Sequence, residues 1–320
     1  MLNETNIVHF LAQQFPESIG DDAAIMKLSV HKSYVITNDL LVEDVHFRLK
    51  YQNPETLAHK ALHVNLSDIA AMGAVPKSIL LGISIPNSYA QQVHTFLEKF
   101  STICKQYDLT LIGGDTTRSS DKLFISITAI GIVVNKNIKY RHSAIVGDII
   151  CVAGDLGKAH IGLTALEKNE KKFDEFKKSF LAPNARLIEG AWLGEQASVS
   201  SMMDVSDGLF IDLKRLCEAS KVAAEINLDN LPYVKSFQQA CDHFKFDSKV
   251  IQLVGGEDYG LLMTIKADEY SNLATKFLKR FGYPLHALGR TTKGSDVHFI
   301  QNDCPKVLNL KPFSHFGETL

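Results

Sequence analysis

Acidic side chains recur where short apolar segments of this 320-residue chain meet turn residues. The segment YVIT is followed by Asn38 and Asp39, TLIGG by Asp115, and SSMMDV by Ser206 and Asp207. We expect these acids in loops just beyond strands, because ligands of α/β proteins usually bind there. Asp and Gly are also ordinary turn formers, so any one of these segments has a purely structural interpretation as well.

A further acid, Asp68, lies in the helical pattern NPETLAHKALHVNLSDIAAMG. Asn53 is a candidate N-cap, with Pro54 at the first helical position. Apolar residues recur at intervals of three and four, and Asp68 shares their face of the helix. A carboxylate directed toward the core needs either a metal ion or hydrogen bonds within the core. Both interpretations stay open for Asp68, and Asn65, one turn earlier, could share its role.

Asp22 in the early turn IGDDAAI and Asp204 in SSMMDV complete a set of six acids. In a common cleft these carboxylates would repel one another unless cations lay among them. Oxygen ligands without paired Cys or His favour Mg²⁺, bound jointly by carboxylates and phosphates. A helical stripe starts at Leu209, so a helix N-terminus beside Asp204 and Asp207 would stabilise either a carboxylate or a phosphate. The six acids are Asp22, Asp39, Asp68, Asp115, Asp204 and Asp207.

Other kinds of site are poorly supported. The chain contains no GxxxxGK[ST] P-loop and no protein-kinase HRD or DFG motif, and His59 and His63 lack the glutamate of a zinc hydrolase motif. A net charge of −2 gives no field that attracts nucleic acid or a membrane surface. The N-terminus has no secretory pattern, no apolar run could span a bilayer, and five scattered cysteines suit a reducing compartment. We therefore expect a cytoplasmic protein with small-molecule partners.

Short apolar or β-branched segments predict strands, and apolar spacings of three and four predict helices, which together indicate a mixed α/β protein. The expected strands are residues 33–42, 107–114, 123–134, 148–154 and 199–205. The expected helices are residues 54–72, 89–106, 157–168, 184–196, 208–220 and 268–281. The polar segment KNIKYRHSAIVGD separates two strands. We therefore expect an N-terminal domain of residues 1–140 and a C-terminal domain of residues 141–320.

Six motifs in order resemble those of the thiamine-monophosphate kinase family: IGDDAAI, TNDLLVEDVHF, KALHVNLSDIAAMGA, LIGGDTTRS, DVSDGL and LVGGEDY. The resemblance runs from about residue 19 to the C-terminus. It implies the fold of the superfamily of aminoimidazole ribonucleotide synthetase and selenophosphate synthetase. In that fold an N-terminal α/β domain binds ATP and Mg²⁺ and dimerises, and a C-terminal α/β domain completes the active site. A homodimer is therefore expected.

The resemblance also implies the reaction, which is ATP-dependent phosphorylation of thiamine monophosphate to thiamine diphosphate with several Mg²⁺ ions. The acidic residues with a catalytic role would be Asp39, Asp115 and Asp207. Matching positions imply metal binding by Asp22, Thr37, Asn38, Asp39, Asp68, Asp115, Asp204 and Asp207. They imply nucleotide binding by Gly114, Asp115, Arg141 and Ser206, and contact with the thiamine phosphate by His46, Glu257 and Phe313. The alternative for Arg141 is a salt bridge in the domain linker, worth little.

Two departures from the family pattern are Asn38, where a hydroxyl residue is common, and Gly260, where an acid is common.

The acceptor phosphate is already largely a dianion near neutral pH, because its second pKa is about 6. We therefore expect direct in-line transfer, driven by positioning and charge neutralisation. Two alternatives remain. One is another ATP-using synthetase of the superfamily, which the lack of a Cys near a Lys in the N-terminal region disfavours for selenium chemistry. The other is a non-catalytic regulator that binds thiamine phosphate.

Overall fold

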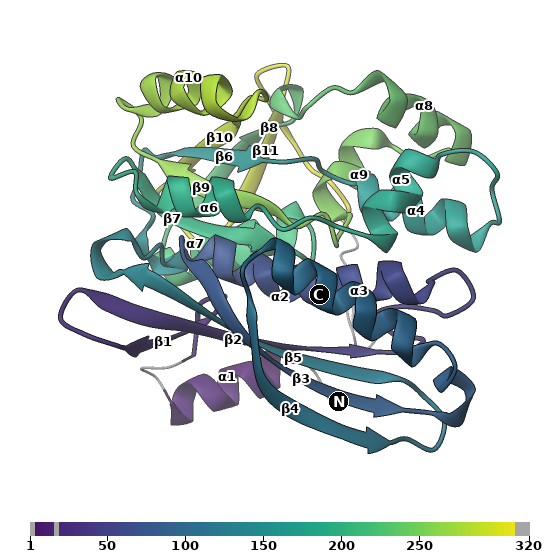
Figure 1. Ribbon diagram of the computed structural model, residues 1–320. Helices are drawn as coiled ribbons and strands as arrows, with labels where there is room; N and C mark the ends of the chain where they lie inside the picture. The colour runs from purple at the N-terminus through teal and green to yellow at the C-terminus, as the bar shows by residue number, and fades with distance from the viewer. Residues whose placement is uncertain (1–3, 16–18, 311–320) are drawn as a thin grey trace.

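The computed structural model describes residues 4–15 and 19–310, and it contains two mixed β-sheets with helices packed on them (Figure 1). The α/β class expected from the sequence is confirmed. Strands of the first sheet end at Val134, and strands of the second begin at Ile149. The boundary predicted near residue 140 falls in this connection and stays a prediction. Within the described parts of the chain, no helix is both long and apolar enough to cross a membrane.

The first sheet has five strands in the order β1-β2-β5-β3-β4, antiparallel except for the parallel pair β3–β4. Its strands are β1 Ala24–Lys27, β2 Lys32–Val42, β3 Val75–Ile85, β4 Thr110–Arg118 and β5 Phe124–Val134. Burial alternates along β2 and β5, which is the pattern of a sheet covered on one face. Helices α2 (Pro54–Ala71) and α3 (Val93–Gln106) cover that face, and α1 (Glu4–Gln14) lies on the far side of the sheet (Figure 1). The short 3₁₀ helices of this half are η1 Asn87–Tyr89, η2 Asn135–Asn137 and η3 Arg141–Ser143.

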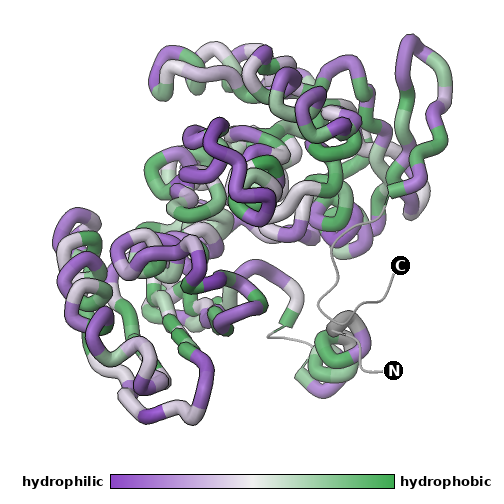
Figure 2. Tube along the Cα trace, turned by 90° about the vertical axis from the view of Figure 1, so that its right-hand side faces the viewer, coloured by the Kyte–Doolittle hydropathy of each residue, from purple (hydrophilic) through white to green (hydrophobic). Residues whose placement is uncertain are grey.

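The second sheet has seven strands in the order β12-β11-β8-β10-β6-β9-β7. Its strands are β6 Ile149–Ala153, β7 Val199–Val205, β8 Ala223–Asn227, β9 Gly260–Ile265, β10 His286–Thr292, β11 Val297–Gln301 and β12 Cys304–Lys306. The helices of this half are α4 Lys158–Glu167, α5 Asp174–Leu181, α6 Leu187–Gly194, α7 Leu209–Ser220, α8 Lys235–Phe244, α9 Ser248–Val254 and α10 Tyr270–Phe281, with the 3₁₀ helix η4 Leu228–Asn230. The Cα trace coloured by hydropathy shows hydrophobic segments concentrated inside both halves (Figure 2).

Helix α2 lies between the two halves, in contact with β2 and β5 of the first and with α6 and β7 of the second. The expected N-cap is confirmed, since the Asn53 side chain accepts a hydrogen bond from the N–H of Thr56 and Pro54 begins the helix. Most side chains of α2 are buried. The sequence predicted burial of a single apolar face, so the helix is more buried than expected. Gly190 in α6 allows the close approach, because a Cβ there would lie 2.3 Å from the carbonyl oxygen of Ala70.

The predicted strands at 33–42, 123–134 and 199–205 are confirmed as β2, β5 and β7. The expectation that Asn38, Asp39 and Asp115 lie in loops beyond strands is wrong, because β2 and β4 continue through them. Every side chain of β4 is exposed at the edge of the sheet, and there a polar residue costs little. Only Ser206 and Asp207 directly follow a strand end. Strand β3 was not predicted, nor were β1 and β8–β12.

Candidate active site

Three carboxylates from distant parts of the chain meet where α2 contacts the second sheet. They belong to Asp22, which precedes β1, Asp68 in α2, and Asp204 in β7, and one oxygen of each lies within 4.8 Å of the others. The side chain of Asp22 is 1% exposed and Asp204 is 2% exposed. Buried acids at this separation repel one another and are expensive without a cation.

Hydrogen bonds fix the carboxylates in place. The Thr37 hydroxyl donates to Asp68 Oδ2 at 2.5 Å, and the Ser67 hydroxyl donates to Asp204 Oδ2 at 2.7 Å. The Asn65 side chain accepts a hydrogen bond from the backbone N–H of Asp39 at 2.9 Å. Asn65 therefore positions the strand that carries Asp39. Asp68 accepts a hydrogen bond within the core and also lies in the acid cluster. Its environment therefore has features of both interpretations made from the sequence, a hydrogen-bonded core residue and a metal ligand.

Arg141 joins the cluster from η3, which connects the two sheets. Its guanidinium contacts both carboxylate oxygens of Asp22, at 2.5 and 3.2 Å, and its backbone N–H donates to Asp21 at 2.6 Å. This contact is the salt bridge in the domain linker that was the alternative for Arg141, but its burial makes it stronger than an exposed pair. The guanidinium offsets part of the negative charge. The nucleotide-binding role implied for Arg141 by the family resemblance stays a prediction.

The pKa values of the acids reflect their crowding. Burial, followed by the charge of Asp22, raises the pKa of Asp204 to about 7. Burial and the charges of Asp207 and Asp22 raise the pKa of Asp39 to about 6. The pKa of Asp68 is also well above its usual range, because of burial and then the nearby charges of Asp39 and Asp204. Without a cation the cluster therefore retains protons near neutral pH, and a divalent ion would compete with them.

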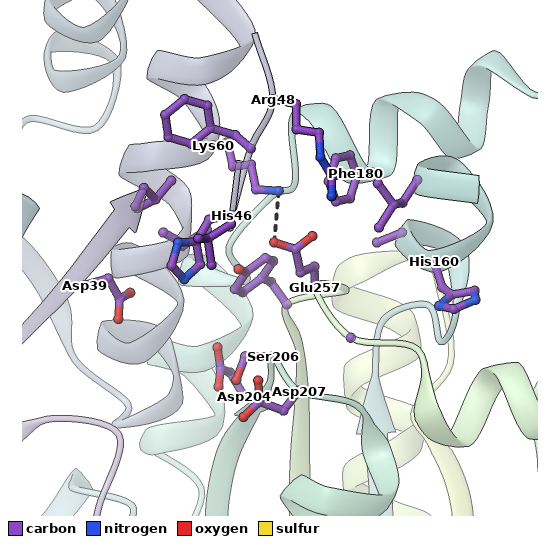
Figure 3. A pocket seen from close by; sticks show the side chains of 18 of the residues that line it. Asp39, His46, Arg48, Lys60, His160, Phe180, Asp204, Ser206, Asp207 and Glu257 are labelled. Carbon is purple, nitrogen blue, oxygen red and sulfur yellow. Dashed lines mark ion pairs between the residues drawn. The ribbon is translucent and has the colours of Figure 1, made fainter. Parts of the chain in front are cut away.

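The cluster borders a cavity of about 570 Å³ between the two halves of the chain. Figure 3 shows Asp39, Asp204 and Asp207 at one end of this cavity, Lys60, Arg48 and Phe180 at the other, and Glu257 between them. Predicted site residues that line it are Asp39, His46, Asp68, Asp204, Ser206, Asp207 and Glu257. An all-oxygen set of hard ligands beside a cavity of this size suits Mg²⁺ together with a phosphorylated ligand.

The loop of Ser206 and Asp207 is held by two residues that sequence reasoning missed. Asp212, in the first turn of α7, accepts hydrogen bonds from the backbone N–H groups of Ser206 and Asp207, both at 3.1 Å. Arg215 contacts Asp207 at 2.5 Å and Asp212 at 3.1 Å. The spacing of three residues between Asp212 and Arg215 on one helix was the available signal. Asp212 therefore orders the end of β7.

Asn38, Gly114 and Asp115 lie outside this cavity. Asp115 pairs with Gly82 across the β3–β4 ladder, in a row that continues through Ser126 to Leu40 on the face opposite α2. The Asn38 amide donates to Ser126 Oγ at 3.0 Å and Thr128 Oγ1 at 2.9 Å on that face. The structure therefore places these three residues apart from the acid cluster. Phe313 lies outside the described residues.

Comparisons with known proteins show the family to which this fold belongs. Residues 20–133 match the model of the AIR synthase related protein, N-terminal domain, and residues 146–301 match that of the C-terminal domain. The fold and the buried acids thus define a protein of the AIR synthase related class. At 36% identity over 94% of this chain, it resembles thiamine-monophosphate kinases of Buchnera aphidicola and Haemophilus influenzae, covering 92% of each. The chain belongs to the thiamine-monophosphate kinase family.

Solved structures support the same assignment. AaThiL complexed with AMPPCP and TMP superposes with a TM-score of 0.86 at 28% identity, covering 98% of this chain and 97% of that one. Thiamine-monophosphate kinase from Stenotrophomonas maltophilia gives a TM-score of 0.77 at 32% identity, with coverage of 92% and 94%. The hydrogenase maturation protein HypE gives a TM-score of 0.72 at 15% identity, which shows a shared fold alone.

Proposed function

We propose that this protein transfers a phosphoryl group from ATP to thiamine monophosphate and forms thiamine diphosphate, in thiamine diphosphate biosynthesis. The observation that carries the proposal is the convergence of Asp22, Asp68 and Asp204 beside a cavity of about 570 Å³. Relatives named thiamine-monophosphate kinase, and the AaThiL structure with AMPPCP and TMP, support this choice of substrates.

The main physical obstacle of this reaction is electrostatic. Two polyanions must approach, and the acceptor phosphate needs no strong general base because it is already largely a dianion near pH 7. Mg²⁺ would supply charge neutralisation and alignment of the phosphates. The all-oxygen donors fit this ion. The residues proposed to hold it at the cavity are Asp22, Thr37, Asp39, Asp68, Asp204 and Asp207.

The other residues would orient the two substrates for in-line transfer. Ser206 and Arg141 are proposed to contact the nucleotide, and His46 and Glu257 to contact the acceptor. The backbone N–H of Glu257 donates to the carbonyl of Ser206 at 2.7 Å, so the loops that carry these two residues are joined. His46 accepts a hydrogen bond from the N–H of Val42 at 3.0 Å, which fixes its ring on the cavity wall. Asp39 and Asp207 are the carboxylates proposed to be catalytic, at the end of the cavity where the phosphates would meet.

A homodimer formed through the N-terminal sheet is part of the proposal. The edge strand β4 exposes Leu111 and Ile112, which are 51% and 54% exposed, together with Asp115. A second copy would cover these apolar side chains and the row of unpaired backbone groups. We retain Asn38, Gly114 and Asp115 as proposed ligand contacts, on the condition that dimerisation or ligand binding brings this part of the sheet to the reacting groups. Analytical ultracentrifugation tests the dimer, and a monomer at micromolar concentration contradicts it.

We also propose a cytoplasmic location and the domain division at residues 1–140 and 141–320. All five cysteines are free thiols, which agrees with a reducing compartment. The division is supported by the connection between β5 and β6, where the chain passes from one sheet to the other. Limited proteolysis tests the division, because a boundary in this connection would give two fragments of unequal size.

The decisive experiment supplies purified protein with ATP, Mg²⁺ and candidate acceptors and measures ADP. ADP formed only with thiamine monophosphate supports the kinase. ADP formed with an acceptor typical of the synthetases contradicts it and selects another activity of the superfamily. Binding of thiamine monophosphate and ATP without ADP formation selects the non-catalytic regulator.

A further inference from the structure

Lys60 is a buried cation on the wall of the active-site cavity, and neither the sequence motifs nor the acid cluster assign it a role. It lies in α2 and is 1% exposed. Its Nζ lies 2.9 Å from Glu257 Oε1 and 3.8 Å from the centroid of the Phe180 ring. Nζ has no hydrogen bond in good geometry to a described residue, so the ion pair and the ring are its contacts. A lysine buried with so few partners is expensive and calls for a functional reason.

The contacts of Lys60 join three elements from both halves of the chain. Lys60 comes from the helix between the sheets, Phe180 from α5, and Glu257 from the loop before β9. Figure 3 shows the ammonium group directed at the Glu257 carboxylate, on the side of that carboxylate away from Asp204 and Asp207. Lys60 therefore fixes the position of Glu257 from the opposite wall.

Lys60 and Asp68 also define a distance along α2. Lys60, Val64 and Asp68 follow one another at four-residue intervals and all line the cavity. Eight residues of α-helix span about 12 Å. One rigid helix therefore separates the acid cluster from the Lys60–Glu257 pair by about the length of an extended small organic phosphate. A ligand whose phosphate reached the acids would place its other end beside this pair.

We propose that Lys60 is a positioning residue that sets the specificity of the site for an acceptor with a cationic ring. By holding the Glu257 carboxylate against the cavity, Lys60 lets that carboxylate face the positive charge of the acceptor ring, while Phe180 shields the ammonium group. The inference rests on the proposed function, because thiamine carries a cationic thiazolium ring. Lys60 acts through Glu257 and has no role in the transfer step.

A double-mutant cycle tests this coupling. Lys60→Met and Glu257→Gln are each expected to raise KM for thiamine monophosphate about ten-fold or more, with kcat and KM for ATP changed less than about three-fold. The double variant is expected to match Glu257→Gln alone, because Lys60 acts through that carboxylate. Lys60→Arg keeps the charge and is expected to restore part of the affinity.

Lys177→Met is the matched control, because Lys177 forms an ion pair of the same length, 2.9 Å, with the exposed Asp174 outside the cavity. It should leave both KM values unchanged. Thermal unfolding of each variant identifies any change caused by loss of fold. An unchanged KM for thiamine monophosphate in folded Lys60→Met, or additive effects in the double variant, overturns the inference alone. Wild-type protein that forms no ADP with thiamine monophosphate overturns the proposed function and this inference with it.

Discussion

The hydroxyl of Ser67 donates a hydrogen bond to Asp204 across the junction of the two halves of the chain. Ser67 belongs to α2, the helix that packs on the first sheet, and Asp204 belongs to β7, an edge strand of the second sheet. Asp68, the next residue along the helix, is itself a member of the acid cluster. The geometry of the cluster is therefore set by how α2 docks on β7.

Ser67→Ala is expected to raise the Mg²⁺ concentration needed for half-maximal activity several-fold, because Asp204 loses the partner that holds it and favours its charged form. The free energy of unfolding should fall by about 1 kcal/mol. A Mg²⁺ titration of activity and a denaturant melt measure the two effects. Ser201→Ala is the control, since Ser201 makes a buried 2.9 Å hydrogen bond to Thr264 in the same sheet. It should cost similar stability and leave the Mg²⁺ requirement unchanged.

Mg²⁺ should stabilise the protein more at pH 8 than at pH 6. The folded-state pKa values of Asp204 and Asp39 are about 7 and 6, above their usual 3.8, so the folded protein binds more protons than the unfolded chain between these limits. The metal-free protein should therefore lose stability as pH rises from about 4 to about 7. A divalent ion displaces those protons and reverses the loss. Melting curves with and without Mg²⁺ measure this, and a shift independent of pH would count against the cluster as the metal site.

Asp115→Asn is expected to remove most turnover while leaving the fold intact. The substitution deletes a charge at nearly constant size, and Asp115 is exposed on β4, so unfolding curves should not change. Steady-state assays across Mg²⁺ concentrations measure the effect. Wild-type turnover in this variant would show that the outer face of the first sheet takes no part in the reaction.

Arg141→Ala is expected to raise KM for ATP and to lower the free energy of unfolding by about 3 kcal/mol, because Asp22 would stay buried without its counterion. Mg²⁺ should recover part of that stability, since it replaces the lost positive charge beside Asp22. Kinetics at varied ATP, with melts in EDTA and in Mg²⁺, separate the two effects. Unchanged ATP kinetics with reduced stability would restrict Arg141 to a structural role.

Local signals in the sequence were sufficient for several elements and for the three acids that the structure brings together. Asn53 and Pro54 identified the start of α2, and the apolar segments identified β2, β5 and β7. Asp22, Asp68 and Asp204 were expected together because all-oxygen ligands imply a shared cation, and the structure brings them within 4.8 Å. The expected strand at residues 33–42 already contained Asp39, but Asp39 and Asp115 were also expected in loops, because Asp and Gly in a sequence resemble a turn whether or not a neighbouring strand pairs with them.

Residue types and motif order were enough to predict a set of acidic side chains with a shared role and the family to which the chain belongs. Which of those side chains meet depends on the tertiary structure. Asp115 lies on the outer face of a sheet whose inner face carries Asp39, and Lys60 meets Glu257 only because α2 is enclosed by both halves. Strand pairing and helix docking join residues far apart in the chain, and no local pattern of residues encodes which of these distant side chains meet.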